Sequence, residues 1–185
     1  MARTIPGPET AALGALAARL GCYIAGAAWE RDDAWPERFF NAAFVVGPSG
    51  HVELRYRKLN EGNYHAGVTG TTPADVLDEH DARLGRDALF PVLGTPHGGL
   101  ACVICNDINY PETVRQLVRR GADIVLHPTG EPNGGYLDLW QDVRLARAAE
   151  NRCFWVSANH GAYRPARTSE DEHRGEALPE VLAAP

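Results

Sequence analysis

The sequence has no surplus of positive charge, and one basic residue type is almost missing from it. Its 185 residues contain 18 lysines and arginines against 24 aspartates and glutamates, so the formal net charge is −6 at pH 7. Such a chain has no overall field that would hold a phosphate backbone or an anionic membrane, so we expect no nucleic-acid and no membrane partner. Lys58 is the single lysine, and all other basic residues are arginines.

Long apolar runs are also scarce, and the chain has four cysteines. No stretch approaches the roughly 20 apolar residues that cross a bilayer. The chain does not open with a charged segment followed by an apolar one, as a secretory signal would. The cysteines lie inside apolar runs, which indicates a reducing, cytoplasmic location; they are Cys22, Cys102, Cys105 and Cys153.

Helical and strand patterns alternate along the chain, which predicts an α/β layered fold. Residues 42–58 have the pattern of a β-hairpin around a turn of Gly, Pro and Ser. Helices are predicted at residues 10–20, 111–120 and 137–151, and strands at residues 23–28, 41–46, 100–105, 123–127 and 153–158.

Two segments lack such a pattern. Residues 59–97 show neither helical nor strand periodicity, which predicts a long functional loop. Residues 162–185 are rich in Arg, Glu, Pro and Ala and predict an irregular polar tail. We therefore expect one domain over residues 1–161, followed by that tail.

Cys105 is the first candidate for chemistry. It ends a predicted strand shortly before a helix that begins at Pro111. Ligands bind at the carboxyl ends of strands in α/β sheets, and a thiol on a tight connection is held rigidly. The alternative is a buried structural cysteine. Cys102 and Cys105 also have the spacing of a redox or zinc pair, but a single strand would separate the two sulfurs, and no second ligand pair follows.

Lys58 is the second candidate, because a chain that otherwise uses arginine has kept one ammonium group at the end of the predicted hairpin. A lysine is a compact charge that can meet an oxyanion, whereas arginine presents a planar fork. We expect Lys58 and Cys105 to converge across neighbouring strands. His65, His97 and His127 could line the same opening, although a structural role is the simpler reading of each.

Several short motifs follow one another along the chain. They are Ile5-Pro6-Gly7-Pro8, Gly47-Pro48-Ser49-Gly50, Tyr56-Arg57-Lys58, the run from Cys102 to Arg115 that includes Cys105-Asn106-Asp107 and Tyr110-Pro111-Glu112, Gly121-Ala122-Asp123, Arg147-Ala148-Ala149-Glu150-Asn151 and Ser157-Ala158-Asn159. In this collinear order they resemble the nitrilase superfamily of carbon–nitrogen hydrolases. The resemblance implies a four-layer α-β-β-α sandwich, incomplete at the first and last strands.

The same resemblance implies a Cys-Glu-Lys catalytic set without metal or cofactor, and a tendency to form homo-oligomers. Cys105 would attack an amide, N-carbamoyl or nitrile carbon, with an amide or carbamoyl substrate favoured. Lys58 and the backbone N–H of Asn106 would hold the oxyanion. Glu61 could correspond to a further glutamate that positions substrate or water in some members, and the alternative is a solvated loop carboxylate. The Asn106 and Asp107 side chains could hold a substrate amide.

The general-base glutamate of the family has no match in this sequence. Four glutamates precede Lys58, and none is expected at the equivalent strand end; they are Glu9, Glu30, Glu37 and Glu53. Three hypotheses follow. The sequence is part of a longer amide hydrolase, it is a short inactive relative that acts by binding or association, or it is a redox module built on Cys102 and Cys105.

Overall fold

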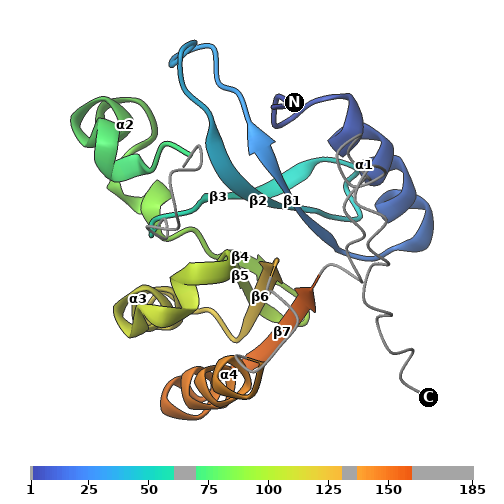
Figure 1. Ribbon diagram of the computed structural model, residues 1–185. Coiled ribbons are helices and arrows are strands. Elements are labelled where there is room, and N and C mark those ends of the chain that lie inside the picture. Colours follow the sequence, from blue (N-terminus) through green and yellow to red (C-terminus); the bar gives the residue numbers. More distant parts are fainter. Residues whose placement is uncertain (1, 61–69, 131–136, 160–185) are drawn as a thin grey trace, which may run out of the picture.

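Two β-sheets pack face to face, and helices cover their outer surfaces (Figure 1). The computed structural model describes residues 2–60, 70–130 and 137–159, so Glu61, His65 and the predicted tail lie outside the described residues. The order of layers is helix, sheet, sheet, helix, which confirms the α/β sandwich expected from the sequence.

The first sheet contains the predicted hairpin. Strands β1 (Ile24–Glu30), β2 (Phe40–Val46) and β3 (Val52–Arg57) are antiparallel in the order β1-β2-β3. Helix α1 (Pro8–Leu20) covers the outer face and packs Ala17 against Ala42, Phe44 and Val46. Because α1 covers one face of β2 and the second sheet covers the other, β2 is a nearly continuous apolar run.

The second sheet is mixed. Its order is β4 (Leu93–Thr95), β5 (Gly98–Cys102), β6 (Ile124–Thr129) and β7 (Phe154–Asn159). Strands β5, β6 and β7 are parallel, and β4 pairs antiparallel with β5. Helices α3 (Pro111–Arg119) and α4 (Leu137–Asn151) provide the crossovers and lie beneath this sheet (Figure 1).

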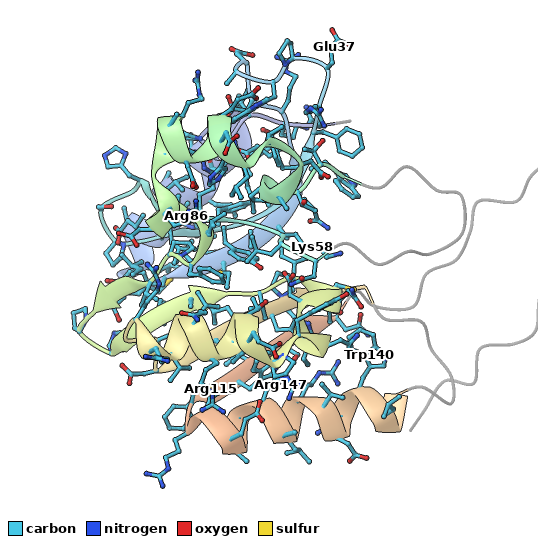
Figure 2. The ribbon with its side chains drawn as sticks, turned by 90° about the vertical axis from the view of Figure 1, so that its left-hand side faces the viewer. Glu37, Lys58, Arg86, Arg115, Trp140 and Arg147 are labelled. Atoms are coloured by element: carbon cyan, nitrogen blue, oxygen red, sulfur yellow. The ribbon has the colours of Figure 1, made fainter. Side chains whose placement is uncertain are left out.

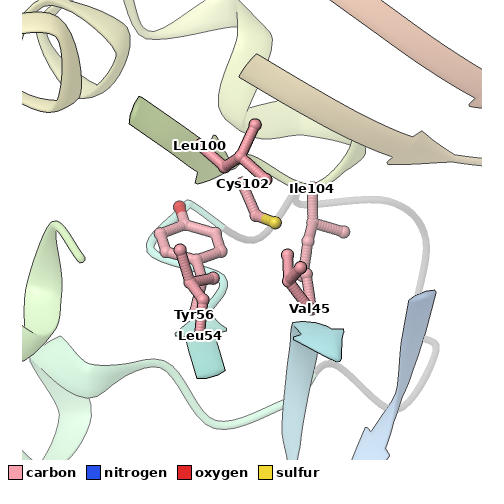
Figure 3. Close-up of a cluster of buried hydrophobic side chains, with 7 residues drawn as sticks. Val45, Leu54, Tyr56, Leu100, Cys102 and Ile104 are labelled. Carbon is pink, nitrogen blue, oxygen red and sulfur yellow. The ribbon is translucent and has the colours of Figure 1, made fainter. Parts of the chain in front are cut away.

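An apolar layer joins the two sheets. Ala43, Val45, Leu54 and Tyr56 from the first sheet meet Leu100, Cys102 and Ile104 from the second (Figure 3). All seven are buried. Burying one large aliphatic side chain contributes about 1.5–3 kcal/mol, so this layer fixes the position of the strand ends that carry Lys58 and Cys105.

The prediction of one unstructured loop over residues 59–97 is wrong for much of that span. The described part contains the 3-10 helix η1 (Pro73–Val76), helix α2 (Leu77–Leu84), the 3-10 helix η2 (Arg86–Leu89) and β4. These elements are short, and tertiary contacts stabilise them. Val76 packs with Trp35 and Phe40, and His80 stacks on Trp35. Both Val76 and His80 are buried. A period of 3.6 residues cannot be recognised over eight residues.

Within the described residues, no helix is both long and apolar enough to cross a membrane.

Candidate active site

A cavity of about 640 Å³ opens where the ends of both sheets meet. Its walls come from the end of β1, the start of β2, the residue after β3, the segment after β5 and the ends of β6 and β7. Trp29, Asn41, Lys58, Ile104, Cys105 and Ala158 are among its lining residues. Figure 2 shows Lys58 at the level where the two layers meet. The structure thus brings Lys58 and Cys105 to one cavity, but from facing sheets rather than from neighbouring strands.

Cys105 occupies a strained backbone position. It begins the 3-10 helix η3 (Cys105–Asn109) and has a φ of 46°, which lies in the left-handed region that side chains other than glycine rarely adopt. Its side chain is partly exposed and lines the cavity. The prediction of a strand up to residue 105 is therefore corrected, because β5 ends at Cys102 and the chain turns sharply at Cys105.

Cys102 has a different environment from Cys105. Its side chain is fully buried between the sheets, and this burial raises the pKa of the thiol to about 12. A thiol that stays protonated is neither a good nucleophile nor a ready partner in disulfide exchange. The four cysteines are all free. The buried, protonated Cys102 thiol therefore argues against the hypothesis of a redox pair formed by Cys102 and Cys105.

Asp107 ties the two halves of the site together. Its carboxylate accepts hydrogen bonds from Tyr56 Oη at 2.7 Å, from the backbone N–H of Asn60 at 2.9 Å and from the backbone N–H of Ile104 at 3.0 Å. Tyr56 and Asn60 flank Lys58 in the sequence, and Ile104 precedes Cys105. The network therefore connects the lysine segment to the cysteine segment.

Burial sets the titration of this network. Asp107 is fully buried, and burial raises the pKa of its carboxyl group although the hydrogen bonds from Ile104, Tyr56 and Asn60 oppose the shift. Burial and the neighbouring Asp107 carboxylate also raise the pKa of Tyr56 well above its usual value. The Asp107 side chain is thus a structural acceptor, and the expectation that it holds a substrate amide is not supported by its contacts.

Asn106 is buried at the same turn. Its side-chain amide donates to the Asn60 carbonyl oxygen at 3.3 Å, and its Oδ1 accepts from Asn109 Nδ2 at 2.9 Å. The side chain thus stabilises the turn. Its backbone N–H, expected from the resemblance to face an oxyanion, belongs to the peptide that joins Cys105 to Asn106.

Glu30 is placed differently from its predicted position in a polar loop. It ends β1 and is buried, with Oε1 2.8 Å from Arg55 and Oε2 2.7 Å from Arg57. Burial alone would lower the pKa of Arg57, but the carboxylates of Glu30 and Asp32 raise it. Arg55 and Arg57 alternate with Tyr56 and Lys58, so Glu30 lies on the sheet face opposite to Lys58.

No carboxylate therefore lines the cavity within the part of the chain that the structure describes. The same described part brings together no group of three or more His, Cys, Asp or Glu side chains that could hold a metal ion.

His127 contacts the backbone of Cys105 and is not among the described lining residues of the cavity. It is fully buried, and its Nε2 lies 3.1 Å from the carbonyl oxygen of Cys105. Its Nδ1 lies 3.0 Å from Ser157 Oγ. His97, by contrast, is exposed and contacts the edge of Tyr23. The single sequence signal for His127 is an imidazole in an otherwise apolar strand.

Comparison with known proteins gives a consistent set of similarities. A sequence model of the carbon–nitrogen hydrolases matches residues 1–172. An omega-amidase of Xenopus laevis is 24% identical over 158 residues, which are 85% of this chain and 54% of the relative. A deaminated glutathione amidase of Rattus norvegicus is 27% identical over 146 residues, which are 77% of this chain and 43% of the relative.

A solved structure gives the same result. It is a glutamate-to-leucine variant of the amidase from Nesterenkonia sp. AN1, with the acetamide moiety of fluoroacetamide added covalently at the active-site cysteine. It matches with a TM-score of 0.62 and 27% identity, over 82% of this chain and 52% of the solved one. The chain spans about half the length of the curated relatives that it matches.

Proposed function

The chain belongs to the carbon–nitrogen hydrolase family, and from this premise we propose that its cavity cleaves the C–N bond of a small amide or N-carbamoyl compound through a thioester on Cys105. The observation that carries the proposal is the meeting of Lys58 and Cys105 in one cavity, with Cys105 on a strained turn. A tight connection at a strand end presents a nucleophile to a ligand and limits its freedom.

The chemistry divides into two steps. Cys105 Sγ attacks the carbonyl carbon, and the C–N bond breaks as ammonia or an amine leaves with a proton, which gives a thioester. Water then adds to the thioester carbonyl, and the acid and the free thiol are released. Lys58 and the backbone N–H of Asn106 stabilise the oxyanion in both steps, and a fixed donor of this kind is worth about 3–4 kcal/mol.

The described lining favours a small substrate. Lys58 is the only charged side chain among the described lining residues, and Ala27, Ala28 and Ala158 leave space beside it. Asn41 also lines the cavity. Its side-chain carboxamide has both donors and an acceptor, so it can form hydrogen bonds to the carboxamide of a substrate.

Slow turnover is expected from the chain of 185 residues, because the second step needs a base to activate water and the described lining supplies no carboxylate. Ammonia release from a panel of small amides tests this. We expect slow release that disappears in Cys105→Ser and persists in Cys102→Ser. Equal release by Cys105→Ser, or loss of release in Cys102→Ser as well, would contradict the proposal.

A second candidate function is amide binding without hydrolysis. The described lining residues include no carboxylate, which favours this candidate as well. Trp29 lines the cavity, so its fluorescence reports occupancy. Saturable quenching by amides without any covalent product on Cys105 would support this alternative and exclude the hydrolase.

A further inference from the structure

A one-way chain of hydrogen bonds runs from the edge of the second sheet to the backbone of Cys105. Trp155 Nε1 donates to Ser157 Oγ at 2.9 Å, Ser157 Oγ lies 3.0 Å from His127 Nδ1, and His127 Nε2 lies 3.1 Å from the Cys105 carbonyl oxygen. His127 and Ser157 are register partners in the parallel pair β6 and β7. The chain is therefore built into the sheet.

The partners decide the direction of each bond. A carbonyl oxygen only accepts, so His127 Nε2 carries a proton and donates to Cys105. In the neutral imidazole Nδ1 is then an acceptor, and it receives the hydroxyl proton of Ser157. The indole N–H only donates, so it occupies a lone pair of Ser157 Oγ and leaves the hydroxyl proton for His127. For a neutral imidazole, the three groups thus specify one tautomer of His127, with the proton on Nε2.

The Cys105 carbonyl group, which accepts from His127, shares a peptide group with the Asn106 N–H, the proposed oxyanion donor. The C=O of Cys105 and the N–H of Asn106 belong to one planar trans peptide, and they point in opposite directions. Fixing the carbonyl on one side therefore aims the N–H to the other side. Cys105 itself has a φ of 46°, an unfavourable backbone conformation that persists only where surrounding contacts such as this one hold it.

The two sides of that peptide correspond to the two faces of the second sheet. Side chains alternate along β6, so His127 shares a face with Val125, which packs against Val114 and Leu117 of α3. Leu126 faces the layer between the sheets. His127 therefore reaches Cys105 from the helix-covered side, and the opposite side is that of Lys58 and the cavity.

We propose that His127 is a positioning residue, which, through its bond to the Cys105 carbonyl oxygen, aims the Asn106 N–H at the oxyanion of the amide substrate. This role rests on the proposed function of Cys105. His127 acts through the backbone and contacts no reacting atom. Ser157 supports it by keeping the proton on Nε2.

The test compares two reactions of Cys105 that differ in their need for an oxyanion. Acylation by p-nitrophenyl acetate passes through an oxyanion, and alkylation by iodoacetamide does not. The variants are His127→Gln, whose amide nitrogen reaches the position of Nε2, and His127→Asn, which is one methylene shorter. His51→Asn, at an exposed histidine of the β2 to β3 turn, is the matched control.

We expect His127→Asn to slow acylation at least about tenfold, less than the 10²-fold to 10³-fold seen when an oxyanion donor is removed. Its alkylation stays within about twofold of the parent, and His127→Gln and His51→Asn stay near the parent in both reactions. Parallel loss of both reactions in His127→Asn, or equal acylation by His127→Asn and the parent, would overturn the proposal.

A measurement that does not depend on any reaction of Cys105 tests the role of His127 separately from the proposed function. Nitrogen NMR of the 20.1 kDa chain reports which imidazole nitrogen of His127 carries the proton and follows the Asn106 amide. We expect protonated Nε2, and an Asn106 amide that shifts in His127→Asn and less in His127→Gln. The opposite tautomer, or equal shifts in both variants, would overturn the role of His127 even if Cys105 is acylated. Absence of acylation in the parent would count against the hydrolase alone.

Discussion

Lys58 shows how one side chain combines burial with charge. It is only 6% exposed, and it shares a cavity with Cys105 although the two residues come from different sheets. We expect Lys58→Met to slow acylation of Cys105 about 10²-fold or more, because a fixed oxyanion donor is lost. Lys58→Arg should not restore the rate, because the planar guanidinium does not fit the place of a compact ammonium.

Acylation by p-nitrophenyl acetate, followed together with the melting temperature, measures both Lys58 variants. A folded Lys58→Met chain that is acylated at the parent rate would show that Lys58 has no part in the reaction.

Asp107 gives a prediction on pH dependence. Burial raises its pKa in the folded state above that in the unfolded state. The folded protein therefore binds the proton more tightly, and this contribution to stability is lost as pH rises through the folded-state pKa. The side chain introduced by Asp107→Asn does not titrate. The free energy of unfolding of the parent, compared with that of Asp107→Asn, should therefore fall as pH rises from below the unfolded-state pKa of Asp107 to above its folded-state pKa.

Urea unfolding of both proteins at a series of pH values gives this difference, and groups common to both cancel. A difference that stays constant with pH, or that grows in favour of the parent as pH rises, would mean that the pKa of Asp107 is not raised in the fold.

The sequence indicated the two candidate residues that line the cavity, but not the contacts that position them. Lys58 and Cys105 were predicted from residue type and position at strand ends. The contacts of His127 and Asp107 could not be predicted, since both depend on partners that lie far away in the chain, 30 residues in one case and 51 in the other. Tertiary packing alone creates such contacts.

Helix α1 lies so close to the turn between β2 and β3 that position 14 has room only for glycine. A Cβ added to Gly14 would lie 2.1 Å from the carbonyl oxygen of Gly50. The clash outweighs the usual preference of helices for alanine, so we expect Gly14→Ala to lower the free energy of unfolding by about 1–3 kcal/mol. Gly94→Ala is the control, because no atom lies within 4 Å of its added Cβ.

Chemical unfolding of these two variants makes the comparison. A Gly14→Ala chain as stable as the parent would show that α1 moves away from the turn at little cost.

Elements with strong patterns were predicted well and weak ones were not. The hairpin, α1, α3 and α4 lie within a few residues of the predicted ranges. Strand β1 ends at Glu30 and not at residue 28 as predicted. The Glu30 carboxylate pairs with Arg55 and Arg57, and nothing in the sequence indicated these partners. Helix α2 was missed because eight residues are too few to show a period.

At the scale of the molecule, both sheets end in strands with exposed apolar side chains. Phe154 and Val156 of β7 are 75% and 51% exposed, and Trp29 of β1 is 41% exposed. Exposed edges of this kind favour association. We therefore expect the chain to form homo-oligomers, with a mass in light scattering that is a multiple of 20.1 kDa.

The double variant Phe154→Ser, Val156→Thr should reduce that mass toward the single chain. A mass of 20.1 kDa for the parent at all concentrations would contradict the expectation.

The thioester on Cys105 is the central claim, and its direct detection is the most decisive measurement. The chain is incubated with a small amide such as propionamide, quenched with acid and analysed by intact mass and peptide mapping. We predict one acyl group on Cys105 that hydroxylamine removes, present in Cys102→Ser and absent in Cys105→Ser. An acyl group on any other residue, or no acyl group on a folded parent chain, would contradict the account.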